Sequence, residues 1–501
     1  MEFTLKEIAD ACGGKLFLEN GKKYDTCVAS VIIDSRKVEP GGAFLATVGE
    51  KVDGHRFISQ VYGAGAVLAV TQKTPEQVQS ETGVDCTGWG SYVLVEDTLQ
   101  ALKDIAEAYR RKVGIPIVGI TGSVGKTSTK EFIAGVLAEK FNVLKTEGNF
   151  NNEIGVPLTL LRIRPEHEVA VVEMGISDFG EMHRLSKMVR PDVCVMTNIG
   201  QCHLENLKTR DGILKAKSEI FDFMAEDGEI CLNGEDDKLG SITEVKGRKP
   251  HFFGLGGNPA EEVRAGQIRS HGLWGSDAVL ELGSICTPGE TKTADRMGDD
   301  SAKAEGIMAE QMKIHVPLPG AHMVLNAAAA ACVARLFGLS AEEIAAGIEK
   351  IQPVSGRNNL IRLEKYTLID DCYNANPASM RAAIDLLAMA DTGKVAILGD
   401  MFELGENSDA LHAGVGEYAA AAGIDTILCV GENAIHMFDA AVDRAEETKH
   451  IAHFPTRDAL LQALEKEREE YIPEGCTVLI KASHGMEFGK ILEFLKACGT
   501  K

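Results

Sequence analysis

The sequence lacks the features of several common protein classes. Its twelve cysteines include no C-x-x-C pair, although disulfide-rich modules and structural zinc sites depend on closely spaced cysteines. No run of about 18 apolar residues occurs. The N-terminus, MEFTLKEIADACGGKL, has neither the basic start nor the apolar core of a signal peptide. We therefore expect a reduced, cytoplasmic protein that spans no membrane.

Basic residues are also scarce relative to acidic ones. The chain has 52 Lys and Arg against 74 Asp and Glu, a net charge of −22. Nucleic acids and acidic membranes are bound by basic surfaces, so we expect neither as a partner. A small anionic substrate is still compatible, because a local group of Arg and amides can bind one. A chain of 501 residues exceeds one ordinary core, which indicates several domains.

The order of apolar patterns predicts an α/β fold of three domains. Residues 1–112 alternate short apolar runs with turns, whereas residues 113–338 and 339–501 alternate apolar strands with helices. Continuous apolar strands between helices indicate a parallel sheet covered on both faces. The stretch 287–311 contains almost no apolar residues, and we expect a mobile insertion there.

Several elements can be predicted individually. Thr4 and Glu7 can form a capping box at the start of a helix that Gly13 ends. A second helix is predicted over 99–112, a third from the end of the glycine-rich loop to about Phe141, and an Ala-rich one over 322–339. Strands are predicted at 31–33, 43–48, 66–70, 115–120, 169–175, 193–200, 366–371, 394–400, 425–431 and 477–483.

A glycine-rich loop, GITGSVGKTSTKE (119–131), follows the predicted strand 115–120. The strict phosphate-binding pattern G-x-x-x-x-G-K-[ST] requires glycine at position 120, where this chain has Ile120. A strand, a glycine-rich turn and a helix that opens with Lys-Thr nevertheless form the usual context of a phosphate site. The alternative is a glycine turn followed by a helix-capping threonine.

The loop residues have distinct expected roles if phosphate is bound. Gly122 and Gly125 let backbone N–H groups face the phosphates. Lys126 would reach the β- and γ-phosphates, and the Thr127 hydroxyl would ligate Mg²⁺.

Three further positions are ambiguous when each is taken alone. Glu173 ends a predicted parallel strand, where carboxylates face the ligand crevice and can hold a hard metal ion. His203 follows the next strand, and Lys217 lies in a helical stretch. A solvated carboxylate, a structural histidine and a surface lysine are the alternatives.

Together with other motifs these positions form a fixed order along the chain. The motifs are TGSVGKT (121–127), NNEIGVP (151–157), EMG (173–175), TNIGQCH (197–203), AKSEIF (216–221), HMVLNAAAA (322–330) and GRN (356–358). This order resembles the Mur ligase family, the ATP-dependent amino-acid and peptide ligases of cell-wall synthesis. In that family the loop reads G-x-x-G-x-x-G-K-[ST], which Gly119, Gly122 and Gly125 satisfy.

The resemblance implies the type of each domain and the nucleotide contacts. It implies an N-terminal α/β UDP-sugar-binding domain, a central parallel-sheet P-loop ATPase domain and a C-terminal Rossmann-like ligase domain. ATP would be bound by Gly122, Ser123, Gly125, Lys126, Thr127 and Ser128 of the loop, by Asn326 of the central domain, and by Arg357 and Asp371 of the third.

The resemblance also implies acyl-phosphate chemistry with two Mg²⁺ ions. A substrate carboxylate attacks the γ-phosphate, and an amine then displaces phosphate. Thr127 and Glu173 would hold one ion, and Glu173 and His203 the other. Lys217 matches a lysine that family members carry as a carbamate, which would also serve the second ion. Because CO₂ adds to a neutral amine, this role requires a lowered pKa of Lys217.

The third segment indicates the acceptor. LIDDCYNANPASM (368–380) and GDMFELGENSDALH (399–412) resemble the dipeptide-adding members, and no D-N-P-R motif of the diamino-acid-adding members occurs. Asn374 and Asn376 would orient the incoming dipeptide. A plain β-to-α turn with Pro377 at the first helical position is compatible with that role.

The first segment resembles the UDP-sugar-peptide-binding domain of the same members. Ser35 and Arg36 would meet the UDP-sugar part, since an arginine fork can bond two diphosphate oxygens. Asn151 and Asn152 are further candidates for substrate binding. One departure is KASHGM near the C-terminus, where His484 replaces the family arginine and brings a group that titrates near neutrality.

The resemblance thus implies a ligase of peptidoglycan precursor synthesis. It would join D-alanyl-D-alanine to UDP-N-acetylmuramoyl-tripeptide and release ADP and phosphate, and we expect a monomer. The alternatives are a diamino-acid-adding Mur ligase, a folylpolyglutamate synthase-like ligase, and a nucleotide-dependent binding protein without catalysis. The intact Lys126, Glu173, His203 and Lys217 argue against the last.

Overall fold

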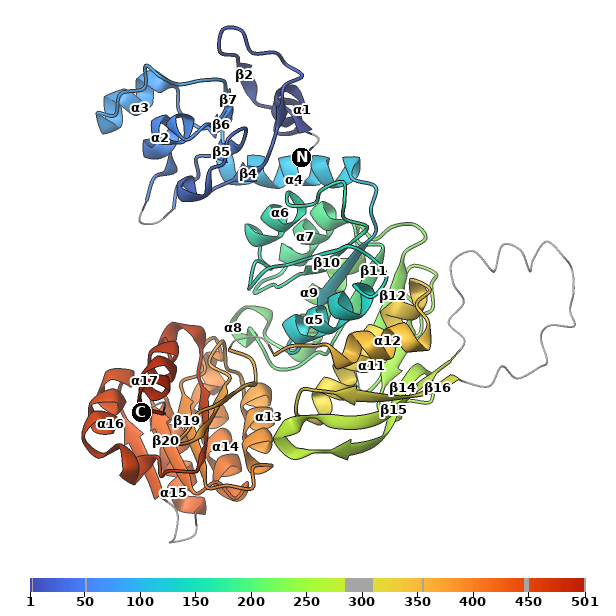
Figure 1. Ribbon diagram of the computed structural model, residues 1–501, viewed down its shortest axis with the longest axis vertical. Coiled ribbons are helices and arrows are strands. Elements are labelled where there is room, and N and C mark those ends of the chain that lie inside the picture. The colour runs from blue at the N-terminus through green and yellow to red at the C-terminus, as the bar shows by residue number, and fades with distance from the viewer. Residues whose placement is uncertain (2, 50–51, 284–309, 354–355, 446–449, 500–501) are drawn as a thin grey trace, which may run out of the picture.

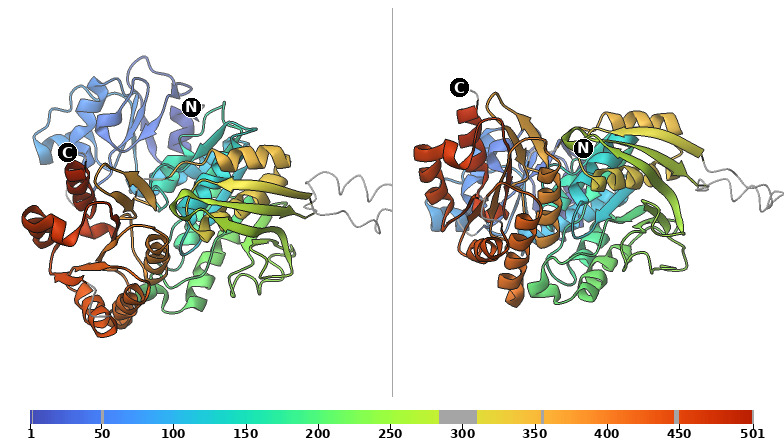
Figure 2. Two further views of the ribbon diagram at one scale, coloured as in Figure 1. Left: turned by 60° about the horizontal axis from the view of Figure 1, so that its bottom comes forward. Right: turned by 90° about the horizontal axis from the view of Figure 1, so that it is seen from below.

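The computed structural model describes residues 1, 3–49, 52–283, 310–353, 356–445 and 450–499. Three large α/β units follow one another along the chain, each built on its own sheet (Figure 1). The first lies at one end of the molecule and the third at the other, with the central unit between them (Figure 1). Two turned views show the third unit directly beside the central one (Figure 2).

The first unit contains a five-stranded sheet in the order β2-β7-β6-β5-β4. The predicted capping box is present, because Thr4 and Glu7 satisfy each other's backbone N–H groups. The strands are Lys15–Phe17 (β2), Val31–Ile32 (β4), Ala43–Leu45 (β5), Leu68–Thr71 (β6) and Tyr92–Leu94 (β7), and Phe3–Thr4 (β1) pairs with Cys27–Val28 (β3). The helices are Leu5–Ala11 (α1), Ile58–Gly63 (α2), Pro75–Thr82 (α3) and Thr98–Lys112 (α4).

The central unit contains a nine-stranded sheet in the order β16-β15-β14-β13-β12-β11-β8-β10-β9. Neighbours from β9 to β14 pair in parallel, and β14, β15 and β16 pair antiparallel. The strands are Ile117–Thr121 (β8), Val143–Lys145 (β9), Val169–Glu173 (β10), Val193–Met196 (β11), Glu229–Asn233 (β12), His251–Gly254 (β13), Glu261–Ser270 (β14), Ser276–Leu282 (β15) and Glu310–Val316 (β16).

Helices cover both faces of the parallel part of this sheet, as its continuous apolar strands predict. Along β8, Ile117 packs into one core, and Val118 and Ile120 pack into the opposite core with α5 and α11. The helices are Lys126–Leu137 (α5), Gly155–Leu160 (α6), Glu181–Val189 (α7), Leu204–Leu207 (α8), Arg210–Ser218 (α9), Ala321–Leu336 (α11) and Ala341–Glu349 (α12).

The third unit contains a six-stranded sheet in the order β17-β18-β22-β19-β20-β21, parallel except for β17. The strands are Asn359–Arg362 (β17), Thr367–Asp370 (β18), Lys394–Gly399 (β19), Thr426–Val430 (β20), His450–Phe454 (β21) and Thr477–Lys481 (β22). The helices are Pro377–Ala388 (α13), Ser408–Ala421 (α14), Ala434–Arg444 (α15), Arg457–Tyr471 (α16) and Gly489–Gly499 (α17).

The structure differs from the sequence prediction at helix ends and in the strands that were not predicted individually. These are β12 to β16 of the central sheet, the short strands β1, β2, β3, β7 and β9, and the edge strands β17 and β21. The helix expected to reach Phe141 ends at Leu137. Beyond it the chain tightens, since the N–H groups of Glu139 and Lys140 bond to carbonyls three residues back. The edge strands β17 and β21 were not predicted, since neither carries a continuous buried apolar run.

The domain boundaries remain predictions. Helix α12, which the predicted boundary assigns to the third domain, contributes Ile344 and Ile348 to the central core. Of the expected insertion at 287–311, residues 287–309 lie outside the described residues, and Glu310 and Gln311 open β16.

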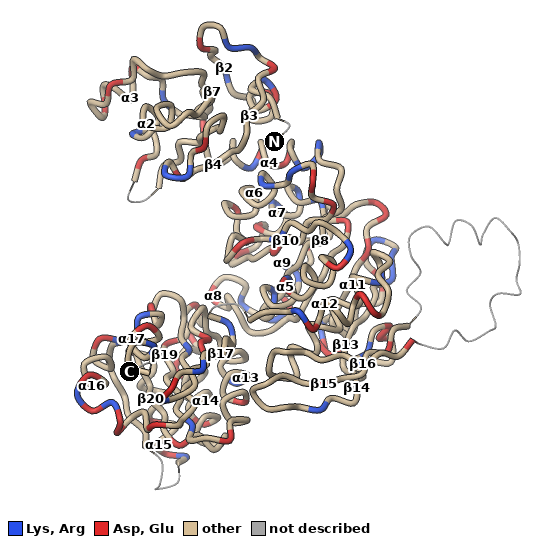
Figure 3. Tube along the Cα trace, in the orientation of Figure 1, with Lys and Arg blue, Asp and Glu red and all other residues tan. Residues whose placement is uncertain are grey.

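Two absences can be stated for the described ranges. The eleven cysteines that the structure describes are all free. No described helix is long and apolar enough to cross a membrane. Acidic and basic residues are scattered along the described trace (Figure 3).

Candidate functional site

The site is a cavity of about 1270 Å³ at the carboxyl edge of the central sheet. Its walls come from the loop after β8, from the ends of β10 and β11, from α11 and from the loops of the third unit. Open parallel sheets bind their ligands at this edge. Leu99 and Lys103 of α4 also reach the cavity, so all three units contribute to its lining.

The glycine-rich loop occupies the centre of the cavity wall. Ile120 is fully buried within β8, so the position that violated the strict pattern belongs to the strand. Gly122 has a φ of 151°, and a Cβ there would lie 1.9 Å from Thr197 Oγ1. Gly125 has a φ of 83° and directly precedes α5. Both glycines are therefore required by the backbone, and the helix N-terminus faces the cavity as a phosphate site demands.

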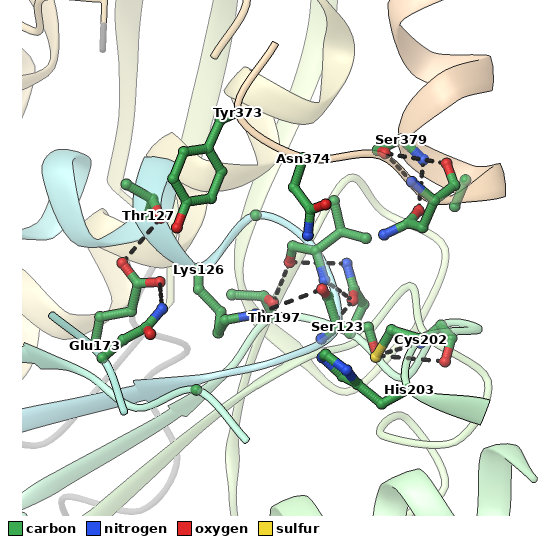
Figure 4. Close-up of a pocket in the computed structure, with 18 of the residues that line it drawn as sticks. Ser123, Lys126, Thr127, Glu173, Thr197, Cys202, His203, Tyr373, Asn374 and Ser379 are labelled. Atoms are coloured by element: carbon green, nitrogen blue, oxygen red, sulfur yellow. Dashed lines mark hydrogen bonds between the residues drawn. The ribbon is translucent and has the colours of Figure 1, made fainter. Parts of the chain in front are cut away.

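Two residues that sequence reasoning did not single out hold this loop in place. Asn198 Oδ1 accepts hydrogen bonds from the backbone N–H groups of Ser123 (3.1 Å) and Val124 (2.9 Å). The Thr197 hydroxyl donates to the Val124 carbonyl at 2.6 Å (Figure 4). Both residues lie in the TNIG motif, next to His203, which was the only residue of TNIGQCH (197–203) with a predicted role.

Lys126 points along the loop into the cavity. Its Nζ donates to the Gly122 carbonyl at 2.8 Å. The surrounding protein lowers the pKa of Lys126 by desolvation, while the Glu173 carboxylate raises it. A lysine at the first turn of the helix after the loop can contribute positive charge to bound phosphates.

Glu173 is a buried carboxylate with both oxygens engaged. Oε2 accepts a hydrogen bond from Thr127 Oγ1 at 2.9 Å, and Oε1 accepts one from Asn151 Nδ2 at 2.8 Å (Figure 4). The three side chains come from α5, the end of β10 and the loop before α6. A carboxylate, a hydroxyl and an amide are the oxygen donors that Mg²⁺ prefers. The donor set therefore fits the predicted ion.

Lys217 is fully buried on α9. Within the described structure its Nζ has no hydrogen-bond partner. Burial, with a contribution from the nearby Lys126 charge, lowers the pKa of Lys217 to about 8. An unpartnered buried ammonium is costly, so a larger fraction of Lys217 is neutral near pH 8 than for an ordinary lysine. Lys217 is not among the described residues that line the cavity.

His203 joins the central unit to the third. Its Nδ1 lies 2.6 Å from Glu403 Oε2, and both residues have left-handed backbones with φ values of 51° and 61°. The hydrogen bond from His203 lowers the pKa of Glu403. Glu403 lies in the GDMFELG stretch, which sequence reasoning used only as an indication of the acceptor. The left-handed backbones of both residues are strained, which indicates that the surrounding fold holds this contact in place.

All three residues predicted to contact the nucleotide from outside the loop, Asn326, Arg357 and Asp371, line the same cavity. Thr129 Oγ1 donates to Asn326 Oδ1 at 2.9 Å. The guanidinium of Arg357 lies 4.1 Å from the centre of the Tyr373 ring. Asp371 forms an ion pair of 2.5 Å with Lys481, which is nearly fully buried.

The predicted acceptor residues form a tight turn. Asn376 Oδ1 accepts the Ser379 N–H at 2.9 Å and caps α13, which begins at Pro377. Asn374 Oδ1 accepts the Ala375 N–H at 2.9 Å, and the Asn374 carbonyl accepts from Lys481 at 3.0 Å. The turn predicted as the alternative is thus present, and both asparagines also line the cavity. Their role in binding a dipeptide stays a prediction.

The remaining substrate candidates divide into two groups. Asn152 lines the cavity, and its Oδ1 accepts the Gly155 N–H at 2.8 Å. Ser35 and Arg36 are not among the described residues that line the cavity. The Arg36 side chain is 84% exposed and pairs with Asp34 at 2.8 Å. The structure therefore does not bring these two residues to the loop.

The loop, the buried carboxylate at the end of the neighbouring strand and the flanking α/β units define a P-loop nucleotide-dependent enzyme of three domains. Three family descriptions match successive parts of the chain: "Mur ligase family, catalytic domain" at residues 28–110, "Mur ligase middle domain" at 120–334 and "Mur ligase, glutamate ligase domain" at 356–484. The chain belongs to the Mur ligase family, as its motifs predict.

Relatives match over nearly the full length. The UDP-N-acetylmuramoyl-tripeptide--D-alanyl-D-alanine ligase of Escherichia coli (strain K12) is 34% identical over 502 residues, 99% of both chains. The enzyme of the same name from Bacillus subtilis (strain 168) is 32% identical over 98% of both chains.

Solved structures confirm the three-domain α/β fold. A crystal structure of MurF from Acinetobacter baumannii is similar with a TM-score of 0.81 and 31% identity over 99% of each chain. The MurF ligase of Thermotoga maritima in complex with ADP has a TM-score of 0.74 and 26% identity, and the match covers 94% of this chain and 97% of that one.

Proposed function

We propose that this chain is an ATP-dependent, ADP-forming ligase that joins D-alanyl-D-alanine to UDP-N-acetylmuramoyl-tripeptide and yields UDP-N-acetylmuramoyl-pentapeptide. The full-length match to ligases named for this activity supports it. One structural observation carries it. The phosphate loop and the Asn374–Asn376 turn line the same cavity, so a nucleotide bound at one and an amine bound at the other would be neighbours.

The reaction requires two bond exchanges in that cavity. The terminal carboxylate of the tripeptide attacks the γ-phosphorus of ATP, ADP leaves, and an acyl phosphate forms. The amine of the dipeptide then attacks the carbonyl carbon, the amide bond forms, and phosphate leaves with loss of a proton. Lys126 and the loop N–H groups bind the phosphates, and Arg357 adds positive charge from the third domain.

The residues present fit Mg²⁺ at one position. Thr127 and Glu173 offer oxygen donors within one hydrogen-bonded group, and the ion would neutralise phosphate charge. For the second predicted ion, Glu173, His203 and a carbamylated Lys217 are proposed. The buried, unpartnered amine of Lys217 supports the modification, because only a neutral amine adds CO₂.

The remaining assignments stay proposals. Ser35 and Arg36 would bind the UDP-sugar part in the first domain. Asn151 and Asn152 would bind the peptide part near the cavity floor. Monomeric state and cytoplasmic location are expectations from the family and the composition.

Product mass identifies the substrate pair directly. The chain is incubated with ATP, Mg²⁺ and UDP-N-acetylmuramoyl-tripeptide, and with either D-alanyl-D-alanine or meso-diaminopimelate. We expect a product whose mass equals tripeptide plus dipeptide minus water, and none with the diamino acid. UDP-N-acetylmuramoyl-tripeptides ending in meso-diaminopimelate and in lysine are compared. A product with the diamino acid, or none with the dipeptide, would contradict the proposal.

A further inference from the structure

A group of three polar side chains lies on the antiparallel part of the central sheet, outside the residues that line the cavity. Asp277 Oδ2 lies 2.8 Å from His271 Nε2, and Asp277 Oδ1 lies 2.8 Å from His315 Nδ1. Asp277 of β15 and His315 of β16 are direct cross-strand partners. His271 immediately follows β14. The β-ladder itself therefore fixes the convergence of the three side chains.

The geometry of the group is that of a metal site. Its three ligand atoms lie within 4.8 Å of one another. Zinc–ligand bonds of about 2.0–2.2 Å place ligand atoms roughly 3–4 Å apart, so small side-chain adjustments would bring all three onto one ion. Among the residues that the structure describes, this is the only group of three or more His, Cys, Asp or Glu whose ligand atoms converge this closely.

The chemistry of the ligands selects the type of ion. Two imidazoles and one carboxylate suit Zn²⁺, Ni²⁺ or Cu²⁺ better than Mg²⁺ or Ca²⁺, which prefer oxygen ligands only. All three side chains are partly exposed, which leaves room for water to complete the coordination.

The group also closes the base of a loop that reaches the third domain. We define residues 271–277 as the docking loop. Its tip carries Leu273, which is buried in the core of the third domain, and Trp274, which lies 4.2 Å below the guanidinium of Arg362 in β17. Figure 1 shows this end of the β14–β15 hairpin beside α13. His271 and Asp277 are the first and last residues of the docking loop.

We propose that His271, Asp277 and His315 bind a divalent transition-metal ion of the Zn²⁺ class, which fastens the base of the docking loop and thereby steadies the contact between the central and third domains. The role is structural, because the group lies outside the cavity and a carboxylate with two partly exposed histidines offers no enclosed substrate site. The proposal does not depend on the identity of the ligase substrates.

Metal titration of the full-length chain tests the site. Chelator-treated protein is titrated calorimetrically with Zn²⁺ in excess Mg²⁺, which occupies oxygen-ligand sites. His271→Gln, Asp277→Asn and His315→Gln are compared with His183→Gln. The control removes an exposed histidine that pairs with Asp222 alone. We expect Zn²⁺ affinity at this site to fall at least about tenfold in each of the three variants and to be unchanged in the control.

A spectroscopic readout locates the ion. The chain has two tryptophans, so Trp89→Phe leaves Trp274 as the only tryptophan, within the docking loop. Cu²⁺ should quench Trp274 fluorescence in that background, and Asp277→Asn should abolish the quenching at the same Cu²⁺ concentration. Hydrogen exchange of the docking loop should slow on addition of Zn²⁺ only when the three ligands are present.

Two results would overturn the proposal. One is wild-type protein that takes up no Zn²⁺ under these conditions. The other is unchanged Zn²⁺ affinity and unchanged quenching in the three variants. Circular dichroism and ligase activity at wild-type level establish that the variants fold, so that a loss of binding reports on the site itself.

Discussion

The two sides of the cavity are built in different ways. On the central-domain side, Thr127, Glu173 and Asn151 form a continuous hydrogen-bonded group around a fully buried carboxylate. On the third-domain side, contacts across the cavity include the more exposed His203–Glu403 pair, in which the Glu403 side chain is 58% exposed.

The difference shows which part of the site is preorganised. One sheet edge and its adjoining loops supply the phosphate-binding side, so packing within a single core fixes its geometry. The acceptor side depends on how two separately folded units meet. Domain closure is a common device for completing a catalytic site. Substitutions on the central side should therefore abolish activity, and substitutions in the cross-domain contacts should only weaken it.

The largest expected effect comes from Glu173→Gln. The amide keeps the size of the side chain but removes the charge that the proposed Mg²⁺ requires. We expect ligase activity to fall at least about 100-fold, as when a transition-state stabiliser is removed, with little change in melting temperature. The control is Glu168→Gln, an exposed carboxylate just before the same strand. Activity within a few-fold of wild type in Glu173→Gln would refute the proposed role.

Lys217 should make stability depend on pH. Its pKa is about 8 in the folded chain against an ordinary value of 10.5, so between these pH values the unfolded chain binds more protons. Stability should therefore rise with pH across this window, by up to about 1.4 kcal/mol per pH unit from this group. Urea unfolding in bicarbonate-free buffer measures the slope.

Lys217→Met should remove that contribution, whereas Lys215→Met, an exposed lysine on the same helix, should not. Equal slopes in wild type and Lys217→Met would show that the buried amine keeps an ordinary pKa. Added bicarbonate should raise wild-type activity most at the lower end of the window, where the neutral amine is scarce.

Gly122→Ala should strain the loop. The new Cβ would collide with Thr197, and the backbone at this position has a conformation that favours glycine. We expect a cost of roughly 1–3 kcal/mol in unfolding free energy and a clear rise in KM for ATP. Gly148→Ala is the matched control, since Gly148 also has a positive φ but a Cβ there would meet nothing within 4 Å. Its KM for ATP should stay at the wild-type value; equal ATP affinities in both variants would contradict the loop assignment.

The smallest effect is expected for Glu403→Gln. The variant weakens the bond to His203, and an exposed pair contributes about 0–1 kcal/mol. We expect a rise of up to about fivefold in KM for D-alanyl-D-alanine, with KM for ATP unchanged. Glu406→Gln in the same loop is the control. A larger effect on ATP than on the dipeptide would contradict the division between the two sides.

The residues on the central-domain side of the cavity could be predicted from the sequence for a physical reason. A strand, a glycine turn and a helix are local, so the spacing of Gly122, Gly125 and Lys126 already constrains the backbone. The carboxyl ends of parallel strands meet at one edge, which brings Glu173 to the loop without knowledge of any other domain.

The remainder depends on contacts between segments that are distant in the sequence. Nothing local indicates that Asn198 caps the loop N–H groups or that Glu403 reaches His203. The sequence around Lys217 indicated only a helix, and the burial of its side chain results from the packing of that helix against the rest of the domain. Ser35 and Arg36 lie in the first domain, apart from the cavity, so their role depends on a substrate that spans domains. The edge strands β17 and β21 were missed because half-exposed strands carry no continuous apolar run.

The central claim is that one sheet edge performs phosphoryl transfer to the tripeptide carboxylate, and that the third domain holds the dipeptide whose amine then displaces phosphate. Phosphate release is therefore measured with ATP and UDP-N-acetylmuramoyl-tripeptide, first without and then with D-alanyl-D-alanine, for wild type and Glu173→Gln. We predict that sustained release in the wild type requires the dipeptide and that Glu173→Gln releases almost none in either case. Wild-type release at the same rate without the dipeptide would contradict the account.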